Sequence, residues 1–423
     1  MAWSARPRIT TAAEDEDAHR ATIESGMQPQ GEGERWDIFC RVVDNFGDVG
    51  VSWRLARSIA REHGKRVRLW LDDLTVLAKL RPEIDPAYDT QALEGVEVAR
   101  LRDPFDVDFV ADVVVETFGC DPPEAYLLAM AAAARKPRWI NLEYLSAEEW
   151  IEGQHGLPSP NPRLPLTKHY FFPGFTAKTG GLLREAGLFA RRDAFQADAG
   201  AQAAFWNGLV GAAPPVGALK VSLFSYASAP LESLARASRQ FPGPVWLVAP
   251  EGVASSVLGQ FALPGHDTIR RNAHPGGSRR ELEIFHVPFL PQDRYDQLLW
   301  ACDINFVRGE DSFVRAQWAA RPFVWHVYPT DDNAHWTKLA AFIARYTAGL
   351  DRAHAGAVTA LWEAWNDRGG DAPQGKAAPG LPQSWVTFTA MREVLRSHAQ
   401  AWSAGLAACP ELAAGLVDFA DNV

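Results

Sequence analysis

The 423-residue chain has little of what would place it in a membrane, outside the cell or on nucleic acid. No apolar run approaches the ~20 residues that span a bilayer, and the polar N-terminus lacks the apolar stretch of a secretory signal. The four cysteines are scattered, without the paired spacing of a zinc site or a redox pair. Acidic residues outnumber basic ones by 52 to 42, whereas a nucleic-acid binder needs a basic face. We therefore expect a cytoplasmic protein with no membrane or nucleic-acid partner.

The length indicates two domains, because a single hydrophobic core stops growing at roughly 250–300 residues. Hydrophobic residues make up 47% of the chain and charged residues 22%, the balance of an ordinary globular protein. The start of the chain is polar and rich in Glu, Asp, Gly and Ala, which predicts disorder. The predicted parts are a disordered extension over 1–34, an N-terminal domain over 35–205, a C-terminal domain over 206–383, and C-terminal helices over 384–423 that can cross back to the N-terminal domain.

Segments of strand and helix character alternate along both halves of the chain. In the first half we expect strands over 37–43, 67–71, 113–116 and 138–142, with helices over 52–60 and 123–135. In the second half we expect strands over 219–224, 245–248, 284–287, 304–307 and 323–327, with helices over 230–239, 293–302 and 311–319. The stretch 153–173, rich in Pro, Gly and Asn, is predicted to be a loop. The alternation predicts an α/β fold of two doubly wound, Rossmann-like domains that face an inter-domain cleft.

The first candidate site is the predicted loop 44–50, with the sequence DNFGDVG, at the carboxyl end of the first strand. Its two glycines allow backbone to come close to a ligand. Asp44 and Asp48 can attract a cation or accept a proton, although together they would repel a diphosphate. Asp and Asn are also common turn and N-cap residues, so a structural role is an open alternative. The GxGxxG fingerprint of a nicotinamide-binding domain is missing here, which argues against an oxidoreductase.

The second candidate site is the segment RGEDS at 308–312, which follows a strand and opens a helix. A helix N-terminus offers unpaired N–H groups to a phosphate, and Ser312 can add a hydroxyl donor. Glu310 can hold ribose hydroxyls or orient a donor substrate. Alternatively, Asp311 or Ser312 only caps the helix.

Aromatic and amide side chains elsewhere in the second half suit a nucleotide. Phe224 and Tyr226 follow the first strand of that half, where a ring can stack on a base and a hydroxyl can reach a phosphate. Core packing is the alternative for Phe224. Gln292 can pair with a base edge or simply begin a helix. No metal is predicted, because the acidic pairs at 72–73 and 331–332 lack partner ligands at clear spacing.

Six segments together resemble one family, EarP, the protein-arginine rhamnosyltransferases of bacterial elongation factor P. They are DNFGDVGVSWRLAR (44–57), INLEYLSAEEW (140–150), FFPGFTAKTGGLLRE (171–185), FSY (224–226), VPFLPQDRYDQLLWACDINFVRGEDSFVRAQWA (287–319) and PFVWHVYP (322–329). The resemblance runs from about Trp36 to the C-terminus, and the N-terminal extension lies outside the family pattern.

The resemblance implies a GT-B fold and transfer of L-rhamnose from dTDP-β-L-rhamnose to an arginine of elongation factor P. It also implies inversion at the anomeric carbon and no metal or other cofactor. It makes Asp48 the catalytic base, Asp44 its support and Glu310 a further essential carboxylate. The donor-binding residues that it implies are Phe224, Tyr226, Gln292, Asp311 and Ser312, with Asn45, Phe46 and Gly47 of the first loop. The acceptor protein would be recognised mainly by the first domain.

Two other functions fit the same fold. One is a non-catalytic binding protein, against which the intact Asp44, Asp48 and Glu310 weigh. The other is an epimerase-like enzyme that modifies a free nucleotide sugar. Dependence of turnover on an acceptor protein would exclude the epimerase.

Overall fold

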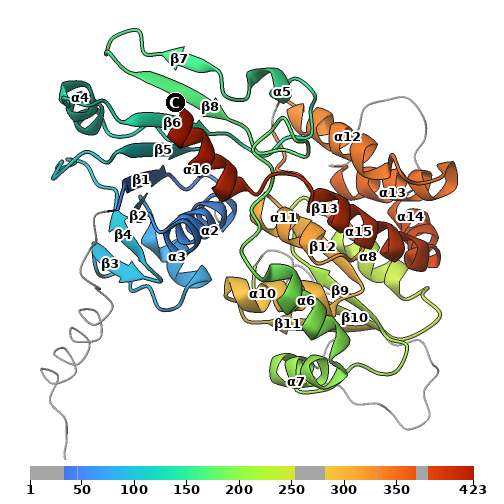
Figure 1. The fold of residues 1–423 in the computed structure, drawn as a ribbon. Coiled ribbons are helices and arrows are strands. Elements are labelled where there is room, and N and C mark those ends of the chain that lie inside the picture. The colour runs from blue at the N-terminus through green and yellow to red at the C-terminus, as the bar shows by residue number, and fades with distance from the viewer. Residues whose placement is uncertain (1–32, 45, 253–281, 331, 368–379) are drawn as a thin grey trace, which may run out of the picture.

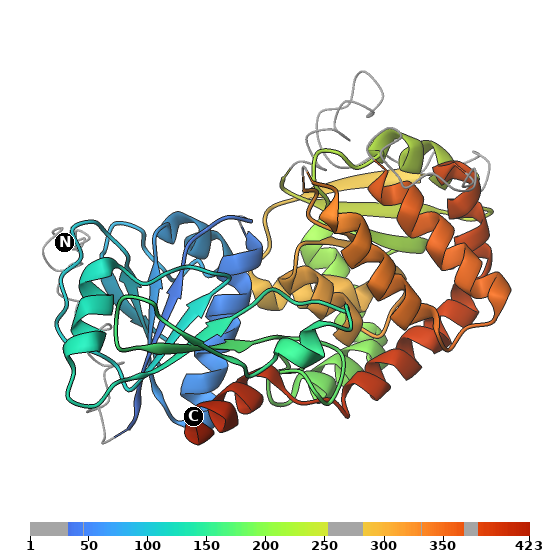
Figure 2. The ribbon, with the colours of Figure 1, turned by 90° about the horizontal axis from the view of Figure 1, so that it is seen from above.

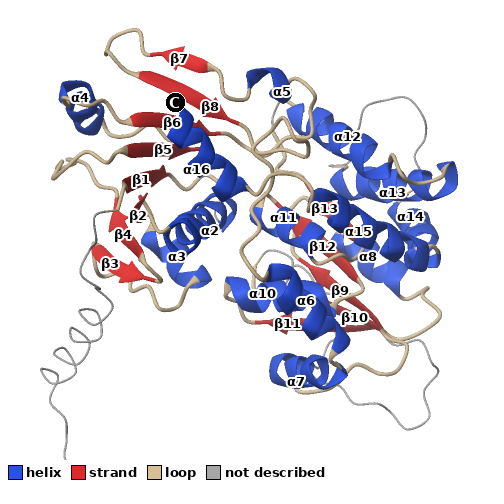
Figure 3. Ribbon diagram, in the orientation of Figure 1, coloured by secondary structure: helices blue, strands red, loops and turns tan. Residues whose placement is uncertain are grey.

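The computed structural model describes residues 33–44, 46–252, 282–330, 332–367 and 380–423, which form two α/β domains (Figure 1). The predicted extension over 1–34 therefore lies outside the described residues, apart from its last two positions. Seen from above, the two domains stand side by side (Figure 2). Each is built on one mainly parallel sheet with helices packed against it (Figure 3). These are the two α/β domains that the alternation predicts, in the GT-B architecture that the resemblance implies.

The first sheet has eight strands, parallel through its centre and antiparallel at both edges. In spatial order they are β3 (Thr90–Leu93), β4 (Val96–Arg100), β2 (Arg66–Leu71), β1 (Arg35–Cys40), β5 (Val113–Thr117), β6 (Arg138–Leu142), β8 (Thr167–Phe171) and β7 (Pro158–Pro160). The helices of this domain are α2 (Phe46–His63), α3 (Leu74–Leu80), α4 (Glu124–Ala132) and α5 (Ile151–Gln154). Core residues of α2 and α3 pack with Ile38 and Val115, while those of α4 pack with Phe39 and Val114 on the other face.

The second sheet has five parallel strands, in the spatial order β11 (Leu282–Val287), β10 (Val245–Pro250), β9 (Leu219–Leu223), β12 (Ile304–Arg308) and β13 (Phe323–His326). Its helices are α6 (Leu188–Ala197), α7 (Ala199–Val210), α8 (Leu231–Ser238), α10 (Gln292–Ala301), α11 (Asp311–Trp318), α12 (Ala334–Thr347), α13 (Arg352–Asn366), α14 (Leu381–Ala390) and α15 (Arg392–Leu406). The strand order reverses between β9 and β12 here, and between β1 and β5 in the first sheet. Open α/β sheets bind ligands at such reversal points, outside the carboxyl ends of the strands.

The chain passes between the domains twice. The linker helices α6 and α7 pack on the core of the second domain, where Phe195 contacts Phe205 and Trp300. Packing on the second domain thus begins before the predicted boundary at 205–206. At the other end, α16 (Leu412–Asn422) returns to the first domain and lies against α2, with Leu412 and Leu416 in that core (Figure 2).

Most expected strands and helices are confirmed to within a few residues, but two segments differ. The stretch 153–173, predicted to be a loop, carries the end of α5, the edge strand β7 and the strand β8 beside it. Its prolines at 158 and 160 lie in the outermost strand, where a missing N–H costs no ladder bond. The helix predicted over 52–60 begins six residues earlier, at Phe46, so most of the DNFGDVG segment is helical.

Candidate active site

Segments from both domains meet where the carboxyl ends of the two sheets face each other. Asp44 follows β1 of the first domain, and Tyr226 follows β9 of the second. The Tyr226 hydroxyl donates a 2.7 Å hydrogen bond to Oδ2 of Asp44. Two of the predicted site segments, which are 182 residues apart, are therefore in direct contact across the cleft.

Asp48 lies in the first turn of α2, and not in a loop as the sequence predicted. Its Oδ2 accepts the backbone N–H groups of Val43 at 2.9 Å and Asp44 at 2.8 Å, just before the helix. A carboxylate that reaches back from the first turn in this way stabilises a helix N-terminus. Burial raises the pKa of Asp48, and these two hydrogen bonds counteract the shift. Asp48 forms no ion pair with any residue that the structure describes.

The two glycines of the segment bring protein side chains close. A Cβ on Gly47 would lie 2.9 Å from Oδ2 of Asp44, and one on Gly50 would lie 2.9 Å from Oδ2 of Asp311. Gly50 thus allows α2 of the first domain to approach the start of α11 of the second. Asn45, which was predicted to contact the donor, lies outside the described residues.

The RGEDS turn surrounds Asp44 from the other domain. Gly309 has a φ of +60°, and a Cβ there would lie 2.5 Å from Oδ2 of Asp44, so only glycine fits. The Arg308 guanidinium lies 4.5 Å from the ring centre of Phe224 and 4.6 Å from that of Tyr226. Burial raises the pKa of Asp44, whereas the Tyr226 hydroxyl and Arg308 lower it. Arg308 was not singled out from the sequence, although it stands in the RGEDS motif.

Glu310 reaches the same space from the start of α11. Its Oε1 lies 3.4 Å from Nζ of Lys338, and the backbone N–H of Leu145 also supports it. Burial raises the pKa of Glu310 to about 7, while Lys338 lowers it. Glu310, Asp48 and Asp44 all line one cavity of about 610 Å³ between the domains. The structure therefore brings together the three carboxylates that the resemblance makes catalytic.

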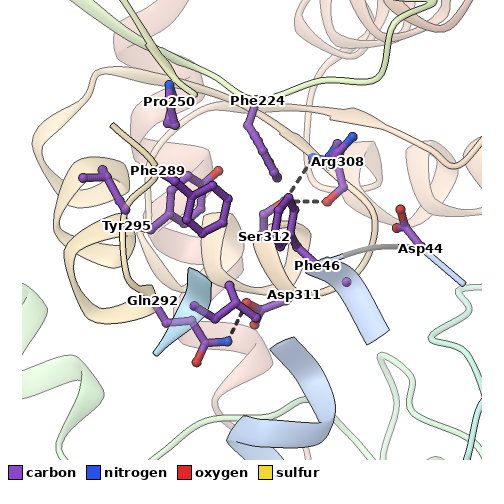
Figure 4. Close-up of a pocket in the computed structure, with 13 residues that line it drawn as sticks. Asp44, Phe46, Phe224, Pro250, Phe289, Gln292, Tyr295, Arg308, Asp311 and Ser312 are labelled. Carbon is purple, nitrogen blue, oxygen red and sulfur yellow. Dashed lines mark hydrogen bonds between the residues drawn. The ribbon is translucent and has the colours of Figure 1, made fainter. Parts of the chain in front are cut away.

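A second, narrow cavity of about 40 Å³ adjoins Asp44 on the side of the second domain. Figure 4 shows its aromatic and polar lining, which includes Phe46, Phe224, Phe289, Tyr295, Gln292, Arg308, Asp311 and Ser312. The Phe46 and Phe289 rings are 4.5 Å apart, one from each domain. Ligand pockets usually measure roughly 300 Å³ or more, so a nucleotide would need these two rings to part.

The polar residues of this cavity are held by protein contacts. Nε2 of Gln292 donates to the carbonyl of Gly50 at 3.1 Å and to Asp311 at 3.2 Å, as the dashed line in Figure 4 marks. Oε1 of Gln292 is buried and has no hydrogen-bond partner among the described residues. It is therefore available to a donor group on a ligand.

Neither Ser312 nor Asp311 caps α11, which was the alternative role predicted for them. The Ser312 hydroxyl bonds to both the N–H and the carbonyl of Arg308, and no side chain caps α11. Asp311 instead forms an ion pair with Arg54, whose Nε lies 2.9 Å from Oδ1 of Asp311. The Ser312 hydroxyl consequently supports the turn that carries Arg308.

Arg54 belongs to a buried ion cluster where α2 crosses α11, which we call the crossing cluster. Its members are Arg54 and Arg57 of α2, Glu185 of the linker, Asp296 of α10, and Asp311 and Arg315 of α11. Three guanidinium groups balance three carboxylates, and the closest pairs, Arg315 with Glu185 and with Asp296, are at 2.6 Å. The cluster was not predicted, because its members are spread over 260 residues and only the fold brings them together.

Neither a membrane segment nor a metal centre emerges from the described part of the chain. Within it, no helix is both long and apolar enough to cross a membrane. The same residues contain no group of three or more His, Cys, Asp or Glu side chains suited to holding a metal ion.

Comparison with known proteins gives one family. The family described as Elongation-Factor P (EF-P) rhamnosyltransferase EarP matches residues 36–421. A protein-arginine rhamnosyltransferase of Pseudomonas putida is 47% identical over 389 residues, which are 92% of this chain and 98% of that protein. A protein of the same name from Neisseria meningitidis is 36% identical over 387 residues, 90% of this chain and 96% of its own.

A solved structure agrees with this result. It is described as the structural basis for EarP-mediated arginine glycosylation of translation elongation factor EF-P, and it shares 36% sequence identity with this chain. It covers 92% of this chain and 99% of its own, with a TM-score of 0.61. With the matched family and the curated relatives, this shows that the chain is a member of the EarP family and a glycosyltransferase of the protein-arginine rhamnosyltransferase class.

Proposed function

We propose that the enzyme transfers L-rhamnose, with inversion, from dTDP-β-L-rhamnose to an arginine side chain of elongation factor P. The observation that carries the proposal is the lining of the 610 Å³ cavity, to which five carboxylates contribute: Asp44, Asp48, Glu143, Glu148 and Glu310. A cavity with this charge suits a cationic acceptor group, and a guanidinium is cationic at neutral pH. The names of the relatives and of the solved structure support the same acceptor.

A protonated arginine side chain is a poor nucleophile, because its nitrogens share a positive charge. Its pKa lies far above neutral pH and far above that of a carboxylate, so a carboxylate cannot deprotonate it in the ground state. In the proposed step, one guanidinium nitrogen attacks the anomeric carbon while the bond from that carbon to the diphosphate oxygen breaks. The attacking nitrogen becomes acidic as it gains the sugar, and its proton passes to Asp48. The diphosphate leaves with the bonding electron pair, on the face opposite to attack, so the configuration inverts.

The narrow cavity fits the nucleotide part of the donor. Phe224 and Phe289 offer ring faces to a base, and the unpartnered Oε1 of Gln292 can accept the ring N–H of thymine. Arg308 is the one Lys or Arg among the described residues that line this cavity. Its guanidinium, together with the positive end of α11, would stabilise the diphosphate as charge develops.

We propose no metal or other cofactor for this chemistry, because Arg308 and the α11 N-terminus can supply the positive charge that the leaving group needs. Turnover should therefore persist after dialysis against EDTA, measured as sugar transfer with and without added Mg²⁺. A loss of activity that Mg²⁺ restores would show that a metal ion supplies that charge.

The test of the function is intact-mass analysis of elongation factor P after incubation with the enzyme and dTDP-β-L-rhamnose. We expect a gain of one deoxyhexose, mapped by peptide fragmentation to a single arginine. Consumption of the donor without acceptor, or an epimerised donor, would favour an enzyme that acts on free nucleotide sugars. A donor that binds and remains intact, with an unmodified acceptor, would favour a non-catalytic binding protein.

A further inference from the structure

We propose that Lys338 occupies, in the free enzyme, the place that the acceptor's guanidinium takes during the reaction, so that acceptor binding displaces the lysine. The inference rests on the proposed arginine acceptor. Lys338 lies on the second turn of α12, and its Nζ stands 3.4 Å from Oε1 of Glu310. The enzyme thus holds a cation of its own against one of the carboxylates proposed for the reaction.

The surroundings of the Lys338 ammonium are those that a guanidinium prefers. Nζ lies 5.5 Å from the ring centre of Tyr144, and this ring is stacked on Phe118 at 4.5 Å. A carboxylate beside an aromatic face is a favourable site for a cation, and for the planar guanidinium in particular. Tyr144 lines the same cavity as Asp48 and Glu310, and burial followed by these two charges raises the pKa of its hydroxyl. Lys338 therefore stands in the part of the cavity where an acceptor nitrogen must approach Asp48.

Charge makes simultaneous occupation unfavourable. Among the described residues that line the cavity, Lys338 is the one Lys or Arg. A second cation placed against Glu310 would lie within a few ångströms of the ammonium, and like charges at that separation repel. The acceptor must then either move Lys338 away or bind more weakly.

The ion pair between Lys338 and Glu310 is weak enough to be displaced. The side chain of Lys338 is 26% exposed and that of Glu310 is 13% exposed, and partly exposed lysine pairs are weak. The four-carbon stem of lysine lets the ammonium turn to solvent without any change in α12. Until the acceptor arrives, Lys338 opposes the effect of burial on Glu310 and favours its ionised form.

Displacement of Lys338 also favours one type of acceptor side chain over another. A lysine acceptor would replace one ammonium by another and gain little. A guanidinium can instead pair with a carboxylate through two parallel N–H bonds and stack on the Tyr144 ring. Lys338 is thus a specificity-determining residue that favours arginine over lysine.

The experiment compares steady-state kinetics of the wild-type enzyme, Lys338→Met and Lys338→Arg. Elongation factor P is varied at saturating dTDP-β-L-rhamnose and at about pH 8.5, above the pKa of about 7 that Glu310 has in the wild type. For Lys338→Met we expect the KM for the acceptor to fall roughly five-fold with kcat within two-fold of wild type, because a competing cation is gone. Lys338→Arg keeps a cation and should keep or raise the wild-type KM. The Kd of N-acetyl-L-arginine amide, measured by calorimetry, should follow the KM values.

Lys65→Met is the matched control, since it removes the same charge from a 2.9 Å pair with Glu34 at the amino end of the first sheet. It should leave the acceptor KM unchanged. An unchanged or higher KM in Lys338→Met, or a lower kcat, would overturn the displacement and make Lys338 a partner that Glu310 needs during turnover. Lys338→Gln gives the same readout should the Met variant not fold. If the wild-type enzyme transfers no sugar, the proposed function is wrong. If it transfers sugar normally but Lys338→Met has an unchanged acceptor KM, only the proposed displacement is wrong.

Discussion

Asp48 is a buried carboxylate whose backbone hydrogen bonds use only one of its two oxygens. It is 2% exposed, and both backbone hydrogen bonds that it accepts end on Oδ2. Oδ1 accepts neither of these bonds, and the side chain of Tyr144 also hydrogen-bonds the carboxylate. The geometry is compatible with the role of base that the resemblance implies, and that role stays a prediction.

Replacing Asp48 by Asn tests the role without removing the backbone contacts, because an amide oxygen still accepts both N–H groups. We expect kcat for sugar transfer to fall by roughly 10²–10⁴-fold, the usual worth of a general base. Donor affinity, measured by calorimetry, should stay within two-fold, since Asp48 lines the carboxylate cavity and not the narrow one. Turnover near the wild-type rate would exclude Asp48 as the base.

The ionisation of Glu310 predicts how kcat/KM for the acceptor depends on pH. Burial raises its pKa to about 7, so a large part of the population is protonated at neutral pH and loses the charge that attracts the acceptor. The active, ionised form exists above this pKa and is lost as the pH falls through it. We therefore expect kcat/KM for the acceptor to decline below about pH 7.

The pH profile of Lys338→Met provides the check on this interpretation. Lys338 lowers the pKa of Glu310, so its removal should move the acid limb to higher pH. An acid limb that stays in place in this variant would mean that another group controls the profile.

At the scale of elements, the turn between β12 and α11 carries the tightest geometric demand of the site. Gly309 adopts a left-handed backbone there, and its Cα faces Asp44 at a distance that no side chain allows. Gly309→Ala should therefore push Asp44 away from Tyr226 and reduce kcat/KM by roughly 10²-fold, as small misplacements of catalytic groups do. Gly119→Ala is the control, because Gly119 is also left-handed but has open space around it. Equal losses in both variants would point to backbone strain alone.

The sequence predicts the presence of helices and strands better than the residues at which they begin. The alternation was enough to predict the five strands of the second sheet and the four central strands of the first, which are buried almost throughout. It missed the outer strands β3, β4, β8 and β7 of the first sheet. The start of α2 was missed because Gly47 and Gly50 suggest a loop. In the structure both glycines serve close approach, Gly47 to Asp44 in the same domain and Gly50 to Asp311 in the other. The second reason appears only when the two domains are together.

The residue types of the candidate site were also predictable, because they follow the carboxyl ends of strands. The contacts among them were not. Tyr226 was expected beside a phosphate, and in this structure its hydroxyl bonds to Asp44. Lys338 lies outside the quoted motifs, and Tyr144 was not singled out although it stands in INLEYLSAEEW. A lone lysine on a helix is usually solvated, and a lone tyrosine beside a strand is usually packed.

At the scale of the whole molecule, the crossing cluster joins the domains beneath the site. Arg54 of the first domain contacts Glu185, Asp296 and Asp311, and its side chain is 1% exposed. Removing one partner from a buried ion network leaves the others uncompensated. The cluster therefore ties the orientation of the domains to Asp311, at the edge of the proposed donor pocket.

Arg54→Met should lower the free energy of unfolding by about 3–5 kcal/mol, measured by denaturant titration. Arg61→Met is the control on the same helix, because Arg61 is 61% exposed and pairs with Glu94 at 2.9 Å. It should cost at most about 1 kcal/mol. Similar small losses in both variants would show that the crossing cluster contributes no more than a surface pair.

The most direct test of the account is a crystal structure of the enzyme with dTDP-β-L-rhamnose bound. We predict that the thymine lies against Phe224 and Gln292, that Phe46 and Phe289 have separated, and that the anomeric carbon faces the cavity between Asp48 and Glu310. A sugar whose reactive carbon points away from that cavity, with Asp48 remote from it, would contradict the central claim that these carboxylates receive the acceptor arginine.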